Sequence, residues 1–325
     1  MRFAAALRAG PIAEAIRAPI LLLWAGAALA FALAVPGFAS AANISAILIS
    51  SLPLLLLATG QTFVLIAAGI DLSAPAIVGL ASVVGGIVMS GDEGWLAGRA
   101  AAVPAGLFAM LATGALAGLG NGLCAGMLRM PAFMVTLVSG MFAGGLAVLL
   151  VRLAAGTETM FALPRAFVAI GSSPAAAALV ACGCALAAGG LLERIRYGRM
   201  LRAVGYNPLA ARVSGVPVGM VTAAAYVVSG TLAAVAAVLL TGHLETASPT
   251  HGRQLLLDVI GATVIGGTSL KGGRGGVWGT AVGVLFLAML GNALTLLNLS
   301  DFMITMLKGL VILVAAIVDS ARERR

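Results

Sequence analysis

The residues best able to do chemistry in this sequence are polar side chains set in long apolar stretches. Asp71, in LIAAGIDLSAP, is the most conspicuous of them. A carboxylate in apolar surroundings is expensive, so it generally faces a cavity or a partner. One interpretation is a carboxylate that lines or gates a pathway. The other is structural: Asp71 or Ser73 accepts hydrogen bonds from the free N–H groups of a helix that begins near Pro75. The two roles are compatible.

Several uncharged polar residues lie in equally apolar surroundings. They are Gln61, Thr62, Asn121, Thr136, Ser139 and Asn292. Hydrogen bonding between helices is the first expectation for each of them. A modest polar passage between helices is the alternative. Asp258 stands at the start of a later apolar run and is interpreted as a helix cap.

The sequence carries no pattern typical of an enzyme or a metal site. It has no G-x-x-x-x-G-K-[ST] loop for a nucleotide, no H-E-x-x-H and no G-x-S-x-G. In GGTSLKGGRGG the lysine is followed by glycine rather than by Ser or Thr. Cys124, Cys182 and Cys184 all lie in apolar runs and are interpreted as small hydrophobic residues. His243 and His251 share a polar loop without a cysteine. We expect no catalytic residue and no metal.

The composition indicates the elements that must position these residues. The chain has 61% hydrophobic and 9% charged residues, with a mean hydropathy of +1.12. A soluble domain has roughly 25% charged residues. The bilayer must therefore act as the solvent. The apolar runs are long and do not alternate with polar residues, which favours helices over a barrel. The expected fold is an all-α polytopic membrane protein.

We expect ten transmembrane helices, at residues 19–36, 46–69, 73–90, 100–126, 131–151, 173–192, 217–240, 257–270, 276–297 and 302–319. The eighth is short and rich in glycine, and almost nothing joins the second to the third. Either place can contain a broken or re-entrant piece.

The basic residues give an orientation. With a cytoplasmic N-terminus, they concentrate in the inside segments, for example in ERIRYGRMLR. Those that fall in outside segments are Arg99, Arg152, Arg165 and Arg253. This bias places both termini in the cytoplasm and explains the net charge of +8 without nucleic acid. The chain is expected to form one transmembrane domain over 1–325, with 1–18, 193–216 and 320–325 inside. The first helix is expected to be retained rather than cleaved as a signal peptide.

Glycines recur at every fourth position in three places. The series are Gly114, Gly118, Gly122 and Gly126; Gly140 and Gly144; and Gly275, Gly279 and Gly283. Residues four apart share a helix face, so each series predicts a smooth groove that another helix can approach closely. A glycine-lined pore is the alternative.

AVGYNPLAARVSGV, in the longest inside segment, predicts a helix of about two turns. Asn207 is a good N-cap, Pro208 suits the first helical position, and Gly215 can end the helix in a left-handed conformation. So short a helix is marginal alone and needs a partner. The alternative is a surface helix that packs on its own chain.

Four stretches together resemble one family. They are GQTFVLIAAGIDLSAP, NGLCAGMLRMPAFMVTLVSGMFAGGLA, GRMLRAVGYNPLAARVSGV and LDVIGATVIGGTSLKGGRGGVWGTAVGVLFLAMLGNAL. In this order they look like the permease subunits of ATP-binding-cassette importers, of the ribose-type sugar permease group. The resemblance covers roughly residues 40–318. The sequence departs from the family pattern at Ala74-Pro75, where Val-Gly is usual, and at Met130-Pro131-Ala132-Phe133, where Pro-Pro-Phe is usual.

The resemblance implies a function. A periplasmic binding protein delivers a sugar or sugar-like solute, a dimer of permeases passes it across the bacterial inner membrane, and separate cytoplasmic ATPases bind ATP and drive the cycle. A homodimer is preferred to a heterodimer, and the chain itself needs no cofactor. The short helix becomes the coupling helix that contacts the ATPase. The residues assigned to this contact are Gly198, Arg199, Ala203, Gly205, Asn207, Pro208, Ala210, Ala211 and Gly215.

A translocation path is the second site that the resemblance implies. The residues assigned to it are Gln61, Asp71, Ser73, Asn121, Phe133, Thr136 and Asn292. The sequence does not choose among pentoses, hexoses, polyols and nucleosides. The main alternative function is an ion-coupled secondary transporter that uses Asp71, and a membrane-embedded enzyme or scaffold is the third.

Overall fold

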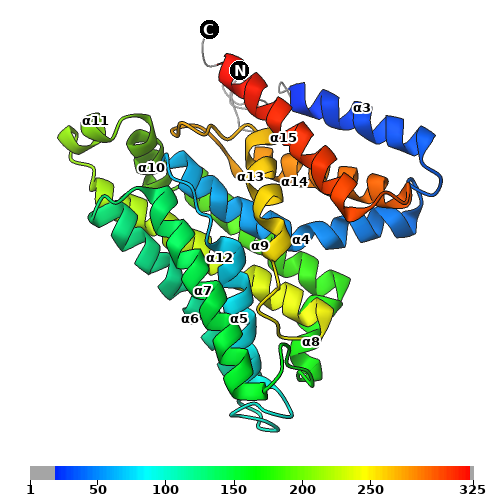
Figure 1. Cartoon of the computed structure of the whole chain (residues 1–325). Coiled ribbons are helices and arrows are strands. Elements are labelled where there is room, and N and C mark those ends of the chain that lie inside the picture. Colours follow the sequence, from blue (N-terminus) through cyan, green and yellow to red (C-terminus); the bar gives the residue numbers. More distant parts are fainter. Residues whose placement is uncertain (1–18, 323–325) are drawn as a thin grey trace, which may run out of the picture.

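The computed structural model describes residues 19–322, and every regular element in this range is a helix (Figure 1). The helices are α3 (Pro19–Ala34), α4 (Ala41–Ile66), α5 (Ala74–Met89), α6 (Ala102–Gly122), a π-helical turn (Leu123–Met127), α7 (Ala132–Ala155), α8 (Arg165–Ser172), α9 (Pro174–Glu193), α10 (Arg196–Tyr206), α11 (Pro208–Val213), α12 (Val218–Leu244), a 3-10 turn (Arg253–Leu255), α13 (Leu256–Ile265), α14 (Val277–Leu296) and α15 (Asp301–Arg322).

Every expected transmembrane stretch contains a helix, and the prediction of an all-α membrane protein is confirmed. Six helices of the described chain are long and apolar enough to cross a membrane: α4, α6 with its π turn, α7, α9, α12 and α14. α5 is a shorter apolar helix. The ten crossings and the orientation stay predictions, and the expected segment 1–18 and the last residues of the tail lie outside the described range.

α13 is shorter than its expected stretch, 257–270. It has 10 residues, so it spans roughly 15 Å, about half of a hydrocarbon core. It ends at Ile265, and two residues later Gly267 has a φ of 84°, a left-handed conformation that favours glycine. The glycines of GGTSLKGGRGG therefore form a loop and do not extend a helix.

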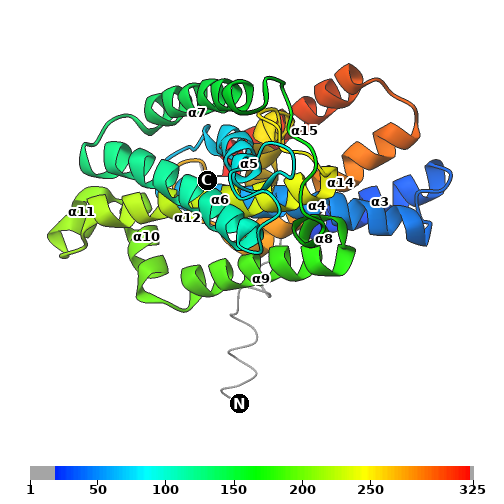
Figure 2. The ribbon, with the colours of Figure 1, turned by 90° about the horizontal axis from the view of Figure 1, so that it is seen from below.

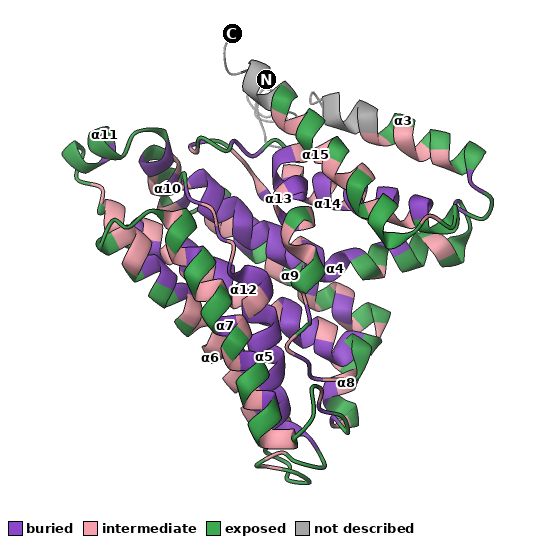
Figure 3. Cartoon of the chain, viewed as in Figure 1, coloured by how far each residue is buried: buried purple, intermediate pink, exposed green. Residues whose placement is uncertain are grey.

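α12 lies at the centre of the helix bundle. It packs against α4, α5, α6 and α8, and α7 and α9 lie on opposite sides of the central helices (Figure 2). Buried residues concentrate in α4, α5 and α12, whereas α3, α7 and α15 carry many exposed ones (Figure 3). Large apolar side chains are exposed on the outer helices, among them Leu33, Phe142 and Phe302, as expected where the bilayer is the solvent.

The first glycine series forms the contact between α6 and α12. A Cβ atom on Gly118 would overlap the carbonyl oxygen of Tyr226, and one on Gly122 would lie 2.6 Å from the carbonyl oxygen of Ala223. The predicted close helix packing is confirmed here. The third series also forms a close contact. Cβ atoms on Gly279 and Gly283 would overlap backbone carbonyl oxygens at the end of α13.

The second series differs. A Cβ on Gly144 would meet nothing within 4 Å in the described chain, and one on Gly140 would lie 3.2 Å from the Cα of Ser73. Only the first of these two glycines therefore approaches another segment of the described chain closely.

Candidate functional site

A break between α4 and α5 forms the centre of the site. α4 ends at Ile66 and α5 begins at Ala74, and the chain between them is not helical. Ala68 has a φ of 61°, a conformation that L-residues rarely adopt. An interruption among apolar helices leaves backbone groups that other parts of the protein must satisfy.

Asp71 lies in this break and is 1% exposed. Its Oδ1 accepts hydrogen bonds from the backbone N–H of Ser73 at 2.9 Å and from the Ser73 hydroxyl at 2.6 Å. Its Oδ2 accepts from the Ser229 hydroxyl on α12 at 2.7 Å. Asn121 of α6 in turn donates to the Ser73 hydroxyl at 2.8 Å. The carboxylate thus caps the break, although it bonds the N–H of Ser73 itself rather than an N–H within α5.

Two more side chains hold the backbone of the break. Oriented to satisfy both groups, the Gln61 amide donates to the Asp71 carbonyl at 3.0 Å and accepts from the Asp71 N–H at 3.3 Å. The Thr136 hydroxyl of α7 donates to the carbonyl of Ile70 at 3.1 Å. α4, α6, α7 and α12 therefore all contribute a polar group to one short segment, which is unusually well fixed for a non-helical stretch.

The structure brings together five of the seven residues assigned to a path: Gln61, Asp71, Ser73, Asn121 and Thr136. The other two lie elsewhere. Asn292 exchanges two hydrogen bonds of 2.9 Å with Asn43, so it links α14 to the start of α4. Phe133 is 54% exposed on α7.

Sequence reasoning missed two members of the cluster, Tyr226 and Ser229. Both are fully buried on α12, at 0% and 1% exposure. Their spacing of three residues puts them on one helix face. Polar side chains on one face of a long apolar helix were the signal available in the sequence.

A groove adjoins this cluster between α5, α6 and α7. It has a volume of about 880 Å³, and its lining is almost entirely apolar. Representative lining residues are Ile77, Leu80, Met134, Val138 and Phe142. Asn121 also lines it, so the groove wall and the Asp71 cluster share a side chain.

A second polar cluster joins α5 to the loop after α12. The Ser82 hydroxyl accepts from Thr241 at 2.7 Å and from the backbone N–H of Ser248 at 3.2 Å, and it lies 3.2 Å from Nδ1 of His251. Burial lowers the pKa of His251 to about 4, so its imidazole is neutral at pH 7. No group of three or more His, Cys, Asp or Glu within residues 19–322 could hold a metal ion.

Asp258 has a different partner from the one its sequence suggests. Its carboxylate pairs with Lys308 of α15 at 2.6 Å, and both side chains are largely buried. Asp258 lies in the first turn of α13, where the helix dipole also favours a negative charge. The pair connects the short α13 to the last helix of the chain.

The expected inside segment 193–216 folds as two helices rather than one. α11 matches the predicted short helix: the Asn207 side chain accepts from the N–H of Ala210 at 3.0 Å, Pro208 occupies the first turn, and Gly215 has a φ of 81°. α10, which precedes it, was not expected as a helix. Its pattern is amphipathic and basic, and such stretches resemble loops when only hydropathy is considered.

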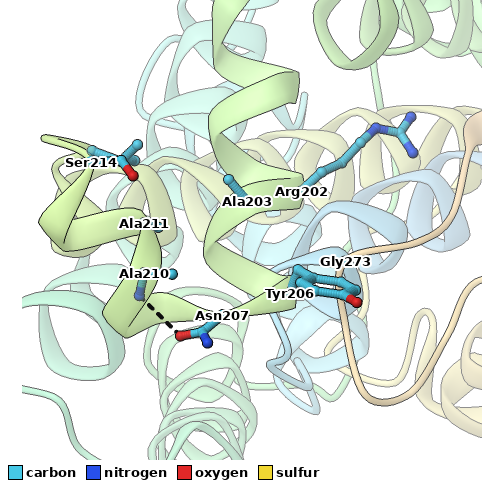
Figure 4. A pocket seen from close by; sticks show the side chains of 9 residues that line it. Arg202, Ala203, Tyr206, Asn207, Ala210, Ala211, Ser214 and Gly273 are labelled. Carbon is cyan, nitrogen blue, oxygen red and sulfur yellow. Dashed lines mark hydrogen bonds between the residues drawn. The ribbon is translucent and has the colours of Figure 1, made fainter.

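α11 presents one apolar edge to the surroundings. Leu209 and Val213, four residues apart, are 73% and 90% exposed, whereas Ala211 is 5% exposed. A notch of about 440 Å³ lies between α10, α11 and Gly273, with Tyr206 and Asn207 on its rim (Figure 4). An exposed apolar edge outside the expected bilayer is typical of a docking surface.

α10 is attached to the break through close backbone contacts. A Cβ on Gly205 would overlap the carbonyl oxygen of Ile66, the last residue of α4. The N–H of Gly273 donates to the same carbonyl at 2.9 Å. Arg202 donates to the carbonyl of Gly275 at 2.8 Å and pairs with Glu193 at 3.3 Å. The loop 266–276 therefore contacts both α10 and the end of α4.

Known transport permeases are similar to this chain in sequence. A family model described as "Branched-chain amino acid transport system / permease component" matches residues 43–316. The ribose import permease of Bacillus subtilis is 36% identical over 273 residues, covering 82% of this chain and 81% of the relative. The L-arabinose transport permease of Escherichia coli is 32% identical over 311 residues, with 94% and 90% covered. The galactose/methyl galactoside import permease of Escherichia coli is 31% identical over 304 residues, with 89% and 90% covered. No solved structure matches the chain. The chain therefore belongs to the permease components of ATP-binding-cassette importers, in the ribose-type sugar group.

Proposed function

We propose that this chain moves a monosaccharide across the bacterial inner membrane as the permease of an importer whose ATPase and periplasmic binding protein are separate chains. Its relatives import ribose, galactose and arabinose. The observation that carries the proposal is the non-helical break between α4 and α5. The polar cluster around this break adjoins a groove between α5, α6 and α7. Breaks of this kind mark the sites of many transporters. The family also confirms that the chain is not an enzyme.

The proposal includes a topology and an assembly. The chain crosses the membrane ten times with both termini in the cytoplasm, and α13 together with the 266–276 loop forms the incomplete eighth crossing. Two copies of the chain form the permease. The concentration of basic residues in inside segments supports the orientation, and no cofactor is needed because ATP is bound by the partner.

The coupling contact divides into two kinds of residue. The outward edge of α11, Leu209 and Val213, docks into the ATPase. The residues assigned from the sequence either shape the helix, as Asn207, Pro208 and Gly215 do, or remain exposed beside it, as Arg199, Ala203 and Ala210 do. Gly198, Gly205 and Ala211 are buried and pack inward. Ala211→Glu or Gly205→Pro would therefore damage the fold as well as the contact.

The transport proposal is tested by reconstitution. The chain is placed in proteoliposomes with its cognate ATPase and binding protein, and uptake of radiolabelled D-ribose, D-galactose and L-arabinose is measured. We expect concentrative uptake of at least one of the sugars that depends on ATP and on both partners. Uptake by the chain alone, driven by a proton or sodium gradient, would refute the proposal and favour an ion-coupled carrier.

The docking proposal is tested on the outward edge of α11. Leu209→Asp and Val213→Asp should each weaken ATPase binding by about tenfold or more, because each places a charge in an apolar contact. Leu209→Met is the matched control, since it keeps volume and apolarity. Unchanged ATPase affinity in both charged variants, measured by co-purification and by titration in detergent, would exclude α11 as the coupling helix.

A further inference from the structure

The Tyr226 hydroxyl is a buried polar group that has no hydrogen-bond partner among residues 19–322. The side chain is 0% exposed, on the central helix α12. Buried tyrosine hydroxyls usually find a partner, because leaving one unpaired is unfavourable. An unpaired group at this position therefore calls for a physical reason.

The hydroxyl points at the break between α4 and α5. A Cβ on Gly69 would lie 2.5 Å from the Tyr226 hydroxyl oxygen and 3.4 Å from its ring carbon Cζ. Only a glycine at position 69 leaves room for the phenol. Asp71 lies two residues after Gly69 in the same break. The unpaired donor thus lies beside the one buried carboxylate of the cluster.

Another donor from α12 occupies that carboxylate. Ser229 donates to Oδ2 of Asp71 at 2.7 Å. Tyr226 and Ser229 are three residues apart, so they lie on one face of α12, one above the other. Two hydroxyl donors of α12 therefore face the same break. Ser229 bonds Asp71, and Tyr226 bonds no group of the described chain.

The face that α6 turns toward α12 is made of glycines. Gly114, Gly118 and Gly122 of α6 lie against α12. Because glycine carries no side chain, these three positions place no side chain between the turns of α12. α12 also begins five residues after α11 ends. A linker of four residues, 214–217, therefore connects α11 to the helix that carries Tyr226 and Ser229.

We propose that Tyr226 is a positioning residue of the transport cycle, which replaces Ser229 as the donor to Asp71 when α12 shifts along α6. The shift is at most about one helical turn, roughly 5 Å. Asp71 keeps a donor from α12 in both states, so the break stays anchored while the helix moves. The inference rests on the proposed function, because an ATPase partner supplies the movement.

The two hydroxyls have opposite effects on the equilibrium between the states. Tyr226→Phe removes a group that is unpaired in the described state and paired in the shifted one, so it disfavours the shifted state. Ser229→Ala does the reverse. A mutation shifts such an equilibrium only through a difference in interaction between the two states. A purely structural role for Tyr226 would not give opposite signs.

The test uses the full chain assembled with its ATPase. Spin labels are placed at Met220 on α12 and Leu116 on α6, which are 62% and 66% exposed. Distance distributions are recorded without nucleotide and with ATP and vanadate. Thr231→Val is the control, because the Thr231 hydroxyl donates to the Val227 carbonyl of its own helix and to no other group among residues 19–322.

We expect nucleotide to populate a second distance in the wild-type assembly. Tyr226→Phe should lower the ratio of second to first population about tenfold, the order expected for one buried hydrogen bond, and Ser229→Ala should raise it. Thr231→Val should leave it unchanged, and Tyr226→Phe should not lower the melting temperature of the chain in detergent. An unchanged ratio in Tyr226→Phe, or no second distance in the wild type, overturns the inference. Failure of the chain to bind the ATPase would instead overturn the proposed function.

Discussion

Replacing Gly118 by alanine tests the close contact between α6 and α12. A Cβ at this position would overlap the carbonyl oxygen of Tyr226 and lie 3.0 Å from both the Tyr226 carbonyl carbon and the Cα of Val227. Carbon atoms normally pack at about 3.5–4.0 Å. The two helices would have to separate by roughly 0.5–1 Å, and because the obstacle is backbone, no side chain can rotate away.

Gly120 provides a matched control two residues further along the same helix. A Cβ there would meet nothing within 4 Å. Both substitutions gain the same helix propensity, at most about 1 kcal/mol, so this gain cancels in the comparison. Overpacking typically costs about 1–3 kcal/mol. Gly118→Ala should therefore be about 1–3 kcal/mol less stable than Gly120→Ala.

The measurement is unfolding of the full chain in mixed detergent micelles, followed by circular dichroism and tryptophan fluorescence. Gly120→Ala should match or slightly exceed the wild type. Gly118→Ala should unfold at a lower fraction of denaturing detergent. Equal stability of the two variants would show that α6 and α12 do not approach as closely as described.

Three further outcomes follow from buried polar contacts. Lys308→Met should destabilise the chain by about 2–4 kcal/mol by leaving Asp258 buried without its partner, whereas adding Asp258→Asn should restore much of the loss; equal stability of single and double variants in detergent unfolding would contradict the pairing. Since burial lowers the pKa of His251 to about 4, the unfolded chain takes up a proton below pH 6.5 that the folded chain does not, so stability should fall between pH 6.5 and 4. His251→Gln should lessen that fall, and an identical pH profile in this variant would exclude the histidine as its source. Asn43→Ala should cost about 1–3 kcal/mol by leaving the Asn292 amide unpaired, and Asn43→Ala with Asn292→Ala should cost less than the sum of the two single changes; strict additivity in a double-mutant cycle would mean that the pair does not interact.

The sequence could indicate α11 fully, because the signals for a short helix are local. An N-cap, a proline at the first helical position and a glycine after the last turn act within a few residues of one another. The sequence did not indicate which side chains of α11 face outward and which face inward. We assigned Ala211 to the contact from the sequence, yet it is 5% exposed, on a helix that packs against α10 and α12.

α8 and α10 show where the sequence pattern was insufficient. Both are short and amphipathic, and α10 is rich in arginine. Hydropathy recognises stretches that are apolar all around, so helices with one polar face between spans are easily taken for loops. Their folding depends on the apolar surface that the long helices present to them.

The sequence alone determined the class of protein, the long apolar helices, the short helix α11 and the family, because hydrophobic burial in a bilayer and helix capping act on composition and on neighbouring residues. It also marked Asp71 as exceptional. Only the tertiary structure decided the partners: Ser229 for Asp71, Lys308 for Asp258 and Asn43 for Asn292. Such pairs join residues 50 to 249 positions apart. They depend on how each helix is rotated and how closely glycines let it approach its neighbour, which no local pattern specifies.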